Sequence, residues 1–132
     1  LDKRWETFPL KVRDNLKRKI TSLSYDNKIV VTSNILCNNF YNFIKKKLLN
    51  SSNIEFYDEP TLNSIISLVY FSETCISSHS GLIVHTAAAF NKKIIDIVHD
   101  EIFNELDRWV PFDTNYKRYN VQNFLDESFK FA

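Results

Sequence analysis

Glycine and methionine are the residues that this 132-residue sequence most clearly lacks. It has one glycine, Gly81, and three prolines, although glycine alone usually makes up about 7% of a protein. Because the turns of β-sandwiches and barrels depend on these residues, the composition argues against a turn-rich all-β fold. Methionine is absent and the chain begins at Leu1. We therefore expect a processed chain or a piece of a longer protein.

A strong net charge, a cysteine motif and a long apolar run are also missing. The formal net charge is +1, so no overall field would attract nucleic acid or an anionic membrane. Cys37 and Cys75 lack the spacing of a zinc site, and we expect two buried thiols in a reducing compartment. No apolar run of about 18 residues and no signal peptide is present. A cytoplasmic protein without a nucleic-acid partner is therefore expected.

Short apolar runs alternate with segments in which apolar residues recur at helical spacing. The runs predict strands at Lys28–Thr32, Ile54–Tyr57, Thr74–Ser77 and Lys93–Val98. The segments at helical spacing predict helices at Thr7–Leu23, Asn38–Leu49, Gly81–Phe90 and Val121–Phe129. A further helix is predicted to begin after Thr61, which would cap it. In the helix after Thr61, the residues expected to be buried are Leu62, Ile65, Ile66, Leu68 and Val69.

This alternation predicts an α/β fold with a Rossmann-like, doubly wound parallel sheet. The length fits a single domain over residues 1–132. Such domains usually open with a strand, whereas a helix comes first here. We therefore expect the first strand to be missing from this chain.

Residues 74–98 carry the clearest functional signal. A strand ends in small polar residues, the only glycine follows at the bend, and an alanine-rich helix begins at once. Free N–H groups at a helix start, together with the helix dipole, favour an anion such as phosphate or pyrophosphate. Gly81 would let that ligand approach the main chain, and Ala87, Ala88 and Ala89 would let the helix pack closely on the sheet. A structural turn without a ligand is the alternative.

Three histidines lie in or near this segment. His85 follows Gly81 by four residues and could reach a bound anion, because helical side chains lean toward the N-terminus. Its alternative is a hydrogen-bonded histidine buried against the sheet. His79 is expected to face a cleft, and His99 lies just past the next strand. The histidines lack the spacing of a zinc site, and no Ser-His-Asp arrangement can be argued from the sequence.

The run Ser78–Phe90, with the following strand and Arg108-Trp109-Val110-Pro111, resembles the signature of the heptosyltransferases, glycosyltransferase family 9. Members read Asp-Thr-Gly-x-x-His-x-Ala-Ala-Ala before such a strand and carry an Arg-Trp-x-Pro element. Lys3-Arg4-Trp5 is similar to the Lys-Arg-Trp that opens the first helix of the family's donor-binding half. The resemblance covers residues 3 to about 112 in the same order. It implies one half of a GT-B fold, here a fragment without the N-terminal acceptor domain.

The resemblance also implies a site for a nucleotide-sugar donor. The residues implied to bind the donor are Lys3, Ser78, His79, Ser80, Gly81 and His85. Lys3 resembles a lysine that meets the donor's phosphates, and Ser80-Gly81 resembles the Thr-Gly whose amides cradle them. His85 matches the motif histidine. The loops near Ser33-Asn34 and Tyr57–Glu59 would border the nucleoside.

Family members transfer a sugar, often heptose from ADP-heptose, with inversion and without an obligatory metal. The resemblance therefore implies a nucleotide-sugar substrate, a glycolipid or saccharide acceptor, and no separate cofactor. It places the activity in lipopolysaccharide or surface-glycan synthesis, with peripheral contact to the inner membrane through the missing half. The catalytic base belongs to that half. We therefore expect the fragment alone to be inactive, and its catalytic residues are unknown.

The sequence departs from the family pattern at three places. His79 stands where the family has aspartate, and three residues rather than two separate Gly81 from His85. His99-Asp100-Glu101 replaces a common Gly-Pro-Thr, so the identity of the donor stays open. Two alternatives remain: a non-catalytic flavodoxin-like binding module, in which Gly81 is only a turn and Lys3 only surface, and a GT-B nucleotide-sugar epimerase.

Overall fold

A computed structural model describes residues 1, 3–33, 38–100, 103, 111 and 115–131. The chain forms two compact units. Unit 1 consists of Leu1–Thr61 with Phe129–Ala132, and unit 2 consists of Leu62–Ser128. The described chain is α/β with parallel strands, as the alternation of short strands and helices predicts. No helix in the described residues is both long and apolar enough to cross a membrane.

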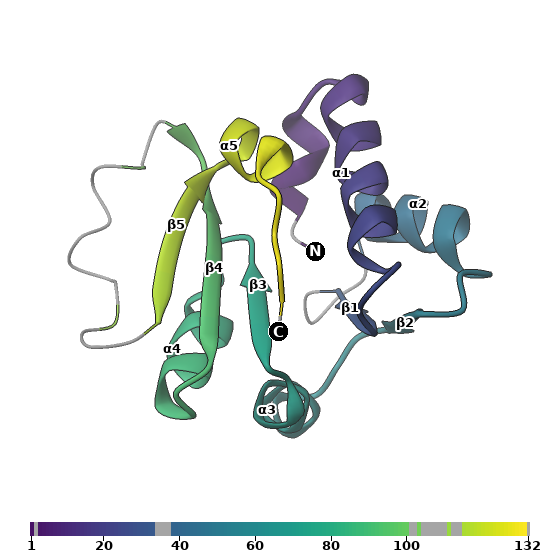
Figure 1. Cartoon of the computed structure of the whole chain (residues 1–132). Helices are drawn as coiled ribbons and strands as arrows, with labels where there is room; N and C mark the ends of the chain where they lie inside the picture. The colour runs from purple at the N-terminus through teal and green to yellow at the C-terminus, as the bar shows by residue number, and fades with distance from the viewer. Residues whose placement is uncertain (2, 34–37, 101–102, 104–110, 112–114, 132) are drawn as a thin grey trace. The chain divides into compact units, whose positions relative to one another are not determined.

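Unit 1 is built from helices and a two-stranded parallel sheet (Figure 1). Its elements are the 3-10 helix η1 (Lys3–Thr7), α1 (Leu10–Leu23), β1 (Ile29–Thr32), α2 (Asn39–Leu48) and β2 (Ile54–Tyr57). The two strands run in register, with Ile29 opposite Ile54 and Thr32 opposite Tyr57. The carboxyl ends of β1 and β2 therefore lie side by side.

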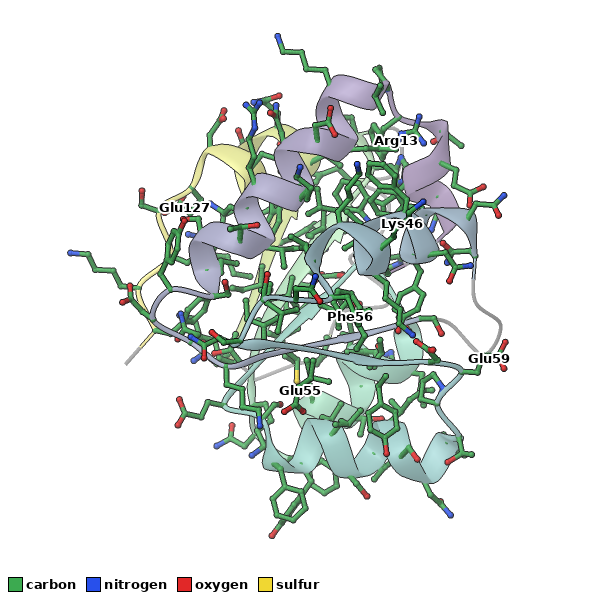
Figure 2. The ribbon with its side chains drawn as sticks, turned by 90° about the vertical axis from the view of Figure 1, so that its right-hand side faces the viewer. Arg13, Lys46, Glu55, Phe56, Glu59 and Glu127 are labelled. Atoms are coloured by element: carbon green, nitrogen blue, oxygen red, sulfur yellow. The ribbon has the colours of Figure 1, made fainter. Side chains whose placement is uncertain are left out.

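The core of unit 1 forms on one face of α2. The Asn38 side chain accepts a hydrogen bond from the Tyr41 N–H at 2.8 Å and so starts the helix. Phe40, which precedes Tyr41 in α2, is 1% exposed and stacks on Trp5 of η1 with ring centroids 5.9 Å apart. Tyr41 meets Phe56 of β2 edge to face at 6.0 Å. Figure 2 shows Phe56 and Glu55 on opposite sides of the strand, as strand geometry requires.

Unit 2 contains a three-stranded parallel sheet in the order β3-β4-β5 (Figure 1). Its elements are α3 (Leu62–Phe71), β3 (Thr74–Ser77), α4 (Gly81–Ala89), β4 (Lys93–Val98), β5 (Tyr116–Asn120) and α5 (Val121–Asp126). Helix α4 contacts β3 and β4, and α5 contacts β4 and β5. Ser77 lies opposite Asp96, which in turn lies opposite Arg118. These three residues form a polar row across the sheet.

The core of unit 2 joins α3, α4 and the sheet. Its buried residues are Ile65, Val69, Cys75, Val84, Ala87 and Ile94. Ala87 is 0% exposed, which confirms that this small side chain lets α4 pack closely. Ala88 is half-buried, whereas Ala89 at the end of the helix is exposed, so its predicted packing role is wrong. Cys75 is buried with a free thiol, as predicted, and Cys37 lies outside the described residues.

The strand predictions agree closely with the structure, and the helix ends differ more. Helix α1 begins at Leu10 rather than Thr7 because Pro9 stands just before it, and proline is suited to a helix start. Helix α5 ends at Asp126 instead of Phe129. Leu62 was expected to be buried but is 56% exposed, since it opens α3 while the covered face is centred on Ile65 and Val69. Strand β5 was not predicted at all.

Truncation of Ile94 tests the core of unit 2. Ile94 is 0% exposed, whereas Ile76 in the neighbouring strand is 41% exposed. Ile94→Ala should lower the free energy of unfolding by about 2–5 kcal/mol, because it leaves a cavity as well as losing apolar burial. Ile76→Ala is the matched control and should cost under about 1 kcal/mol. Urea denaturation measures both, and equal losses would contradict this description of the core.

Candidate functional site

The junction between β3 and α4 is the centre of the candidate site. Ser77 ends β3, Gly81 begins α4, and Ser80 occupies the N-cap position just before the helix. The Ser80 side chain makes no capping hydrogen bond, while its N–H donates to the buried Ser77 hydroxyl at 2.8 Å. The first N–H groups of a helix have no acceptor within the helix. The Ser80 side chain therefore leaves backbone N–H groups uncapped at the start of α4. Uncapped N–H groups at a helix start are what an anion site needs.

The bend of the junction is made by His79, not by Gly81. His79 has φ = 55°, in the left-handed region that non-glycine residues rarely adopt, at a cost of about 1–2 kcal/mol. Gly81 does not have a positive φ, and a Cβ atom built on it would meet nothing within 4 Å. The positive φ that a glycine often supplies in a turn therefore belongs to His79 here. Neither the backbone nor the packing of unit 2 requires a glycine at position 81.

Asp96 of β4 holds His79 in this conformation. Asp96 as a residue is 0% exposed. One carboxylate oxygen, Oδ1, accepts the His79 N–H at 2.9 Å, and Oδ2 lies 3.0 Å from Nδ1 of the His79 ring. The His79 side chain is only 22% exposed and is turned toward Asp96, so the expectation that it simply faces a cleft needs correction. The contact with a buried carboxylate offsets the cost of the left-handed backbone.

Tyr116 of β5 completes the environment of this carboxylate. Its hydroxyl donates to Oδ2 of Asp96 at 2.8 Å. Burial raises the pKa of Tyr116 to about 12, and the neighbouring Asp96 charge acts in the same direction, while a hydrogen bond with Arg118 opposes it. Tyr116 therefore keeps its proton near neutral pH. The Arg118 guanidinium also donates to the Phe103 carbonyl and lies over the Phe103 ring.

The other predicted site residues are placed as follows. Ser78 is half-buried beside His79 at the junction, together with Ser80. His85 is exposed on α4, so the alternative in which it is buried against the sheet is wrong. Lys3 belongs to η1 of unit 1, and its side chain lies outside the described part of the structure. Of the Arg108–Pro111 element, only Pro111 is described.

In unit 1, the structure brings together the two loops that were expected to border a nucleoside. The buried Ser33 hydroxyl, just after β1, accepts the N–H of Glu59 at 3.0 Å, while Asn34 lies outside the described residues. The Asp58 carboxylate accepts hydrogen bonds from the Tyr41 hydroxyl and the Lys45 ammonium. Both hydrogen bonds lower the pKa of Asp58 below its usual value, and the one from Lys45 has the larger effect.

Sequence reasoning missed Asp96 and Tyr116, and it did not single out Asp58 within the predicted loop Tyr57–Glu59. A signal for Asp96 was present, because a lone carboxylate within the apolar run Ile94–Val98 is rarely buried unless it is paired. Tyr116 carried no such signal, since β5 itself was not predicted. Asp58 follows a predicted strand, but its pairing with Tyr41 and Lys45 depends on how α2 packs on β2.

The candidate site combines hydrogen-bond donors with the buried carboxylate of Asp96. Among the described residues, no group of three or more His, Cys, Asp or Glu side chains could hold a metal ion. Comparison of the chain with models of protein families, with curated proteins and with solved structures finds no match.

The Asp58 cluster predicts a specific pH dependence of stability. Because its pKa is lowered in the folded state from an ordinary value of 3.8, the paired Asp58 stabilises the fold above that pH, and the gain is lost as the pH falls through the folded-state pKa. The pair is exposed, so the gain should be only about 0.2–1 kcal/mol. Urea denaturation of the parent and of Asp58→Asn should show a difference at pH 7 that shrinks in acid.

A double-mutant cycle supplies the control. In a Lys45→Gln background, Asp58→Asn should cost less than in the parent, because the main cause of the shift is gone. An equal cost of Asp58→Asn in both backgrounds would show that Lys45 does not stabilise this carboxylate.

Proposed function

We propose that this chain is the donor-binding half of an inverting GT-B glycosyltransferase similar to family 9. It would bind a nucleotide sugar, with Ser78, His79, Ser80 and Gly81 against the diphosphate. One observation carries the proposal: α4 begins, without a side-chain cap from Ser80, at the carboxyl end of a strand in a parallel sheet. In open α/β sheets, ligands bind at this end of the strands.

The open space at Gly81 supports a ligand there. A glycine in the middle of a helix costs about 0.5–1 kcal/mol relative to alanine. At Gly81, the first residue of α4, neither φ nor packing calls for a glycine. A ligand that approaches the main chain closely would explain the residue. A phosphate oxygen fits this position because N–H groups and the helix dipole both favour an anion.

The strand orders within the two sheets support the doubly wound topology. A common order in such folds is 3-2-1-4-5-6, in which strands 2 and 3 are neighbours and strands 4, 5 and 6 follow one another. The pair β1-β2 and the set β3-β4-β5 match these two groups.

The remaining roles follow from the resemblance. His85 would add a hydrogen-bonding group to the phosphates. The roles expected for Lys3 and for the loops at Ser33 and Glu59, all in unit 1, stay predictions. The acceptor, a glycolipid or saccharide, and the base that deprotonates it would belong to the other half of the enzyme. A cytoplasmic location and inner-membrane contact through that half are part of the same proposal.

Thermal denaturation with nucleotides tests the proposal. The chain is mixed with ADP, UDP, GDP and their sugars at millimolar concentration. A ligand at 100 times its Kd stabilises the native state by about 2.7 kcal/mol, so at least one nucleotide should raise the melting temperature by several degrees. If none does so, the donor site is abandoned and a non-catalytic binding module becomes the better description.

Substitution at Gly81 separates ligand binding from folding. Gly81→Ala should leave the free chain equally stable or slightly more stable, because a Cβ atom meets nothing there, yet it should abolish most of the nucleotide effect. Ala89→Gly, at the exposed end of the same helix, is the control. It should lower stability by at most about 0.5–1 kcal/mol, the cost of a glycine in the middle of a helix, and keep the nucleotide effect. Full nucleotide stabilisation of Gly81→Ala would disprove the close approach.

A further inference from the structure

The outer surface of α3 and α4 is unusual because it lacks Asp, Glu, Lys and Arg. Neither helix contains any of these four residue types, whereas a helix at the surface of a soluble protein usually carries charged residues on its outer face. Both helices contribute buried residues to the core of unit 2 and contact each other. Their remaining sides therefore form one continuous surface without acidic or strongly basic side chains.

Three exposed aromatic rings gather where these two helices end. Phe71 is the last residue of α3 and is 83% exposed, Tyr70 precedes it, and Phe90 directly follows α4. The Tyr70 ring meets Phe71 edge to face with ring centroids 5.1 Å apart, and it meets Phe90 in the same way at 5.2 Å. We call these three residues the aromatic patch. Exposed apolar groups that are contiguous, unlike scattered ones, mark interaction surfaces.

The charges beside the aromatic patch have opposite signs. Lys92 directly precedes β4, and its ammonium lies 5.6 Å from the centre of the Tyr70 ring. Glu73 directly precedes β3 and is exposed. Because β3 and β4 are parallel and their first residues are paired, Glu73 and Lys92 lie side by side. Lys93, the first residue of β4, points away from the core face on which Ile94 lies.

This pair of charges favours a second copy of the chain as the partner. An anionic membrane would attract Lys92 and repel Glu73. Two copies related by a two-fold axis present the same patch to each other, so Glu73 of each protomer can meet Lys92 of its partner. The centre of a protein interface is also depleted of charge and enriched in aromatic residues, with a polar rim. The aromatic patch has this composition.

We propose that the aromatic patch is the surface through which two copies of this chain form a symmetric dimer. Phe71, the most exposed of the three rings, packs into the patch of the partner at the centre of the interface. At the rim, Glu73 of each protomer pairs with Lys92 of the other. The inference does not depend on nucleotide binding, because no residue of the patch or its rim belongs to the junction between β3 and α4.

Sedimentation velocity of the full chain, from micromolar to millimolar concentration, tests the dimer. The parent should change from monomer to dimer as the concentration rises. Phe71→Ser should weaken the dimer about tenfold or more, as expected when a central aromatic side chain of an interface is truncated. Tyr25→Ser is the matched control, since Tyr25 is 76% exposed and lies outside the patch, and it should dimerise like the parent. A parent that stays monomeric, or equal effects of the two substitutions, would overturn the inference.

Exchange of the rim charges tests the symmetric pairing. Glu73→Lys or Lys92→Glu gives every copy a rim of one sign, so each variant alone should dimerise several-fold more weakly than the parent. An equimolar mixture of the two variants should form mixed dimers that are tighter than those of either variant, because a positive rim then meets a negative one. Mixed dimers that are no tighter would contradict the pairing and overturn the inference.

Vesicle sedimentation distinguishes a second copy from a membrane. The parent and Phe71→Ser are mixed with phosphatidylcholine vesicles, with and without anionic phosphatidylglycerol. The two proteins should remain in solution to the same extent with both kinds of vesicle. If the parent binds the anionic vesicles and Phe71→Ser does not, the aromatic patch is a membrane-binding surface and the inference is wrong.

Discussion

The buried Asp96 carboxylate is the interaction on which the candidate site depends. It lies within a strand of apolar residues, where an unpaired charge would be strongly destabilising. Its hydrogen bonds to the N–H and ring of His79 and to the hydroxyl of Tyr116 satisfy both oxygens. In doing so they fix the junction after β3, and that junction determines where α4 begins. A single paired charge thus connects the sheet, the bend and the helix start.

The contact between Asp96 and His79 changes the role assigned to Gly81, the one glycine of the sequence. The left-handed residue of the junction is His79, which is held there by Asp96, while Gly81 begins the helix in ordinary conformation with open space where its Cβ would be. Backbone strain and a specific side-chain contact occur together at His79, and strain of this kind is often found at functional sites. His79 and the uncapped start of α4 are adjacent in the chain. A ligand bound to the N–H groups of the helix start would therefore lie near His79.

Much of the fold could be predicted from local pattern, and the rest depends on distant contacts. The strands Ile54–Tyr57 and Lys93–Val98 are short apolar runs bounded by polar residues, and both have the predicted ends. Strand β5 is polar in sequence, with Lys117 and Arg118 at its centre, and is a strand because it pairs with β4. In the same way, Ser78–Gly81 could be identified from their own sequence. The contact between His79 and Asp96 could not, because it spans 17 residues and depends on the register of β3 against β4.

The most direct test of this account is the hydrogen exchange rate of one backbone amide. The His79 N–H donates to a carboxylate that is 0% exposed, so NMR should find this amide strongly protected although it lies in a loop. In Asp96→Ala, the protection should be lost while amides in the centre of β4 remain protected. A His79 amide that exchanges in the parent protein as fast as in an unstructured peptide would contradict the central role of Asp96.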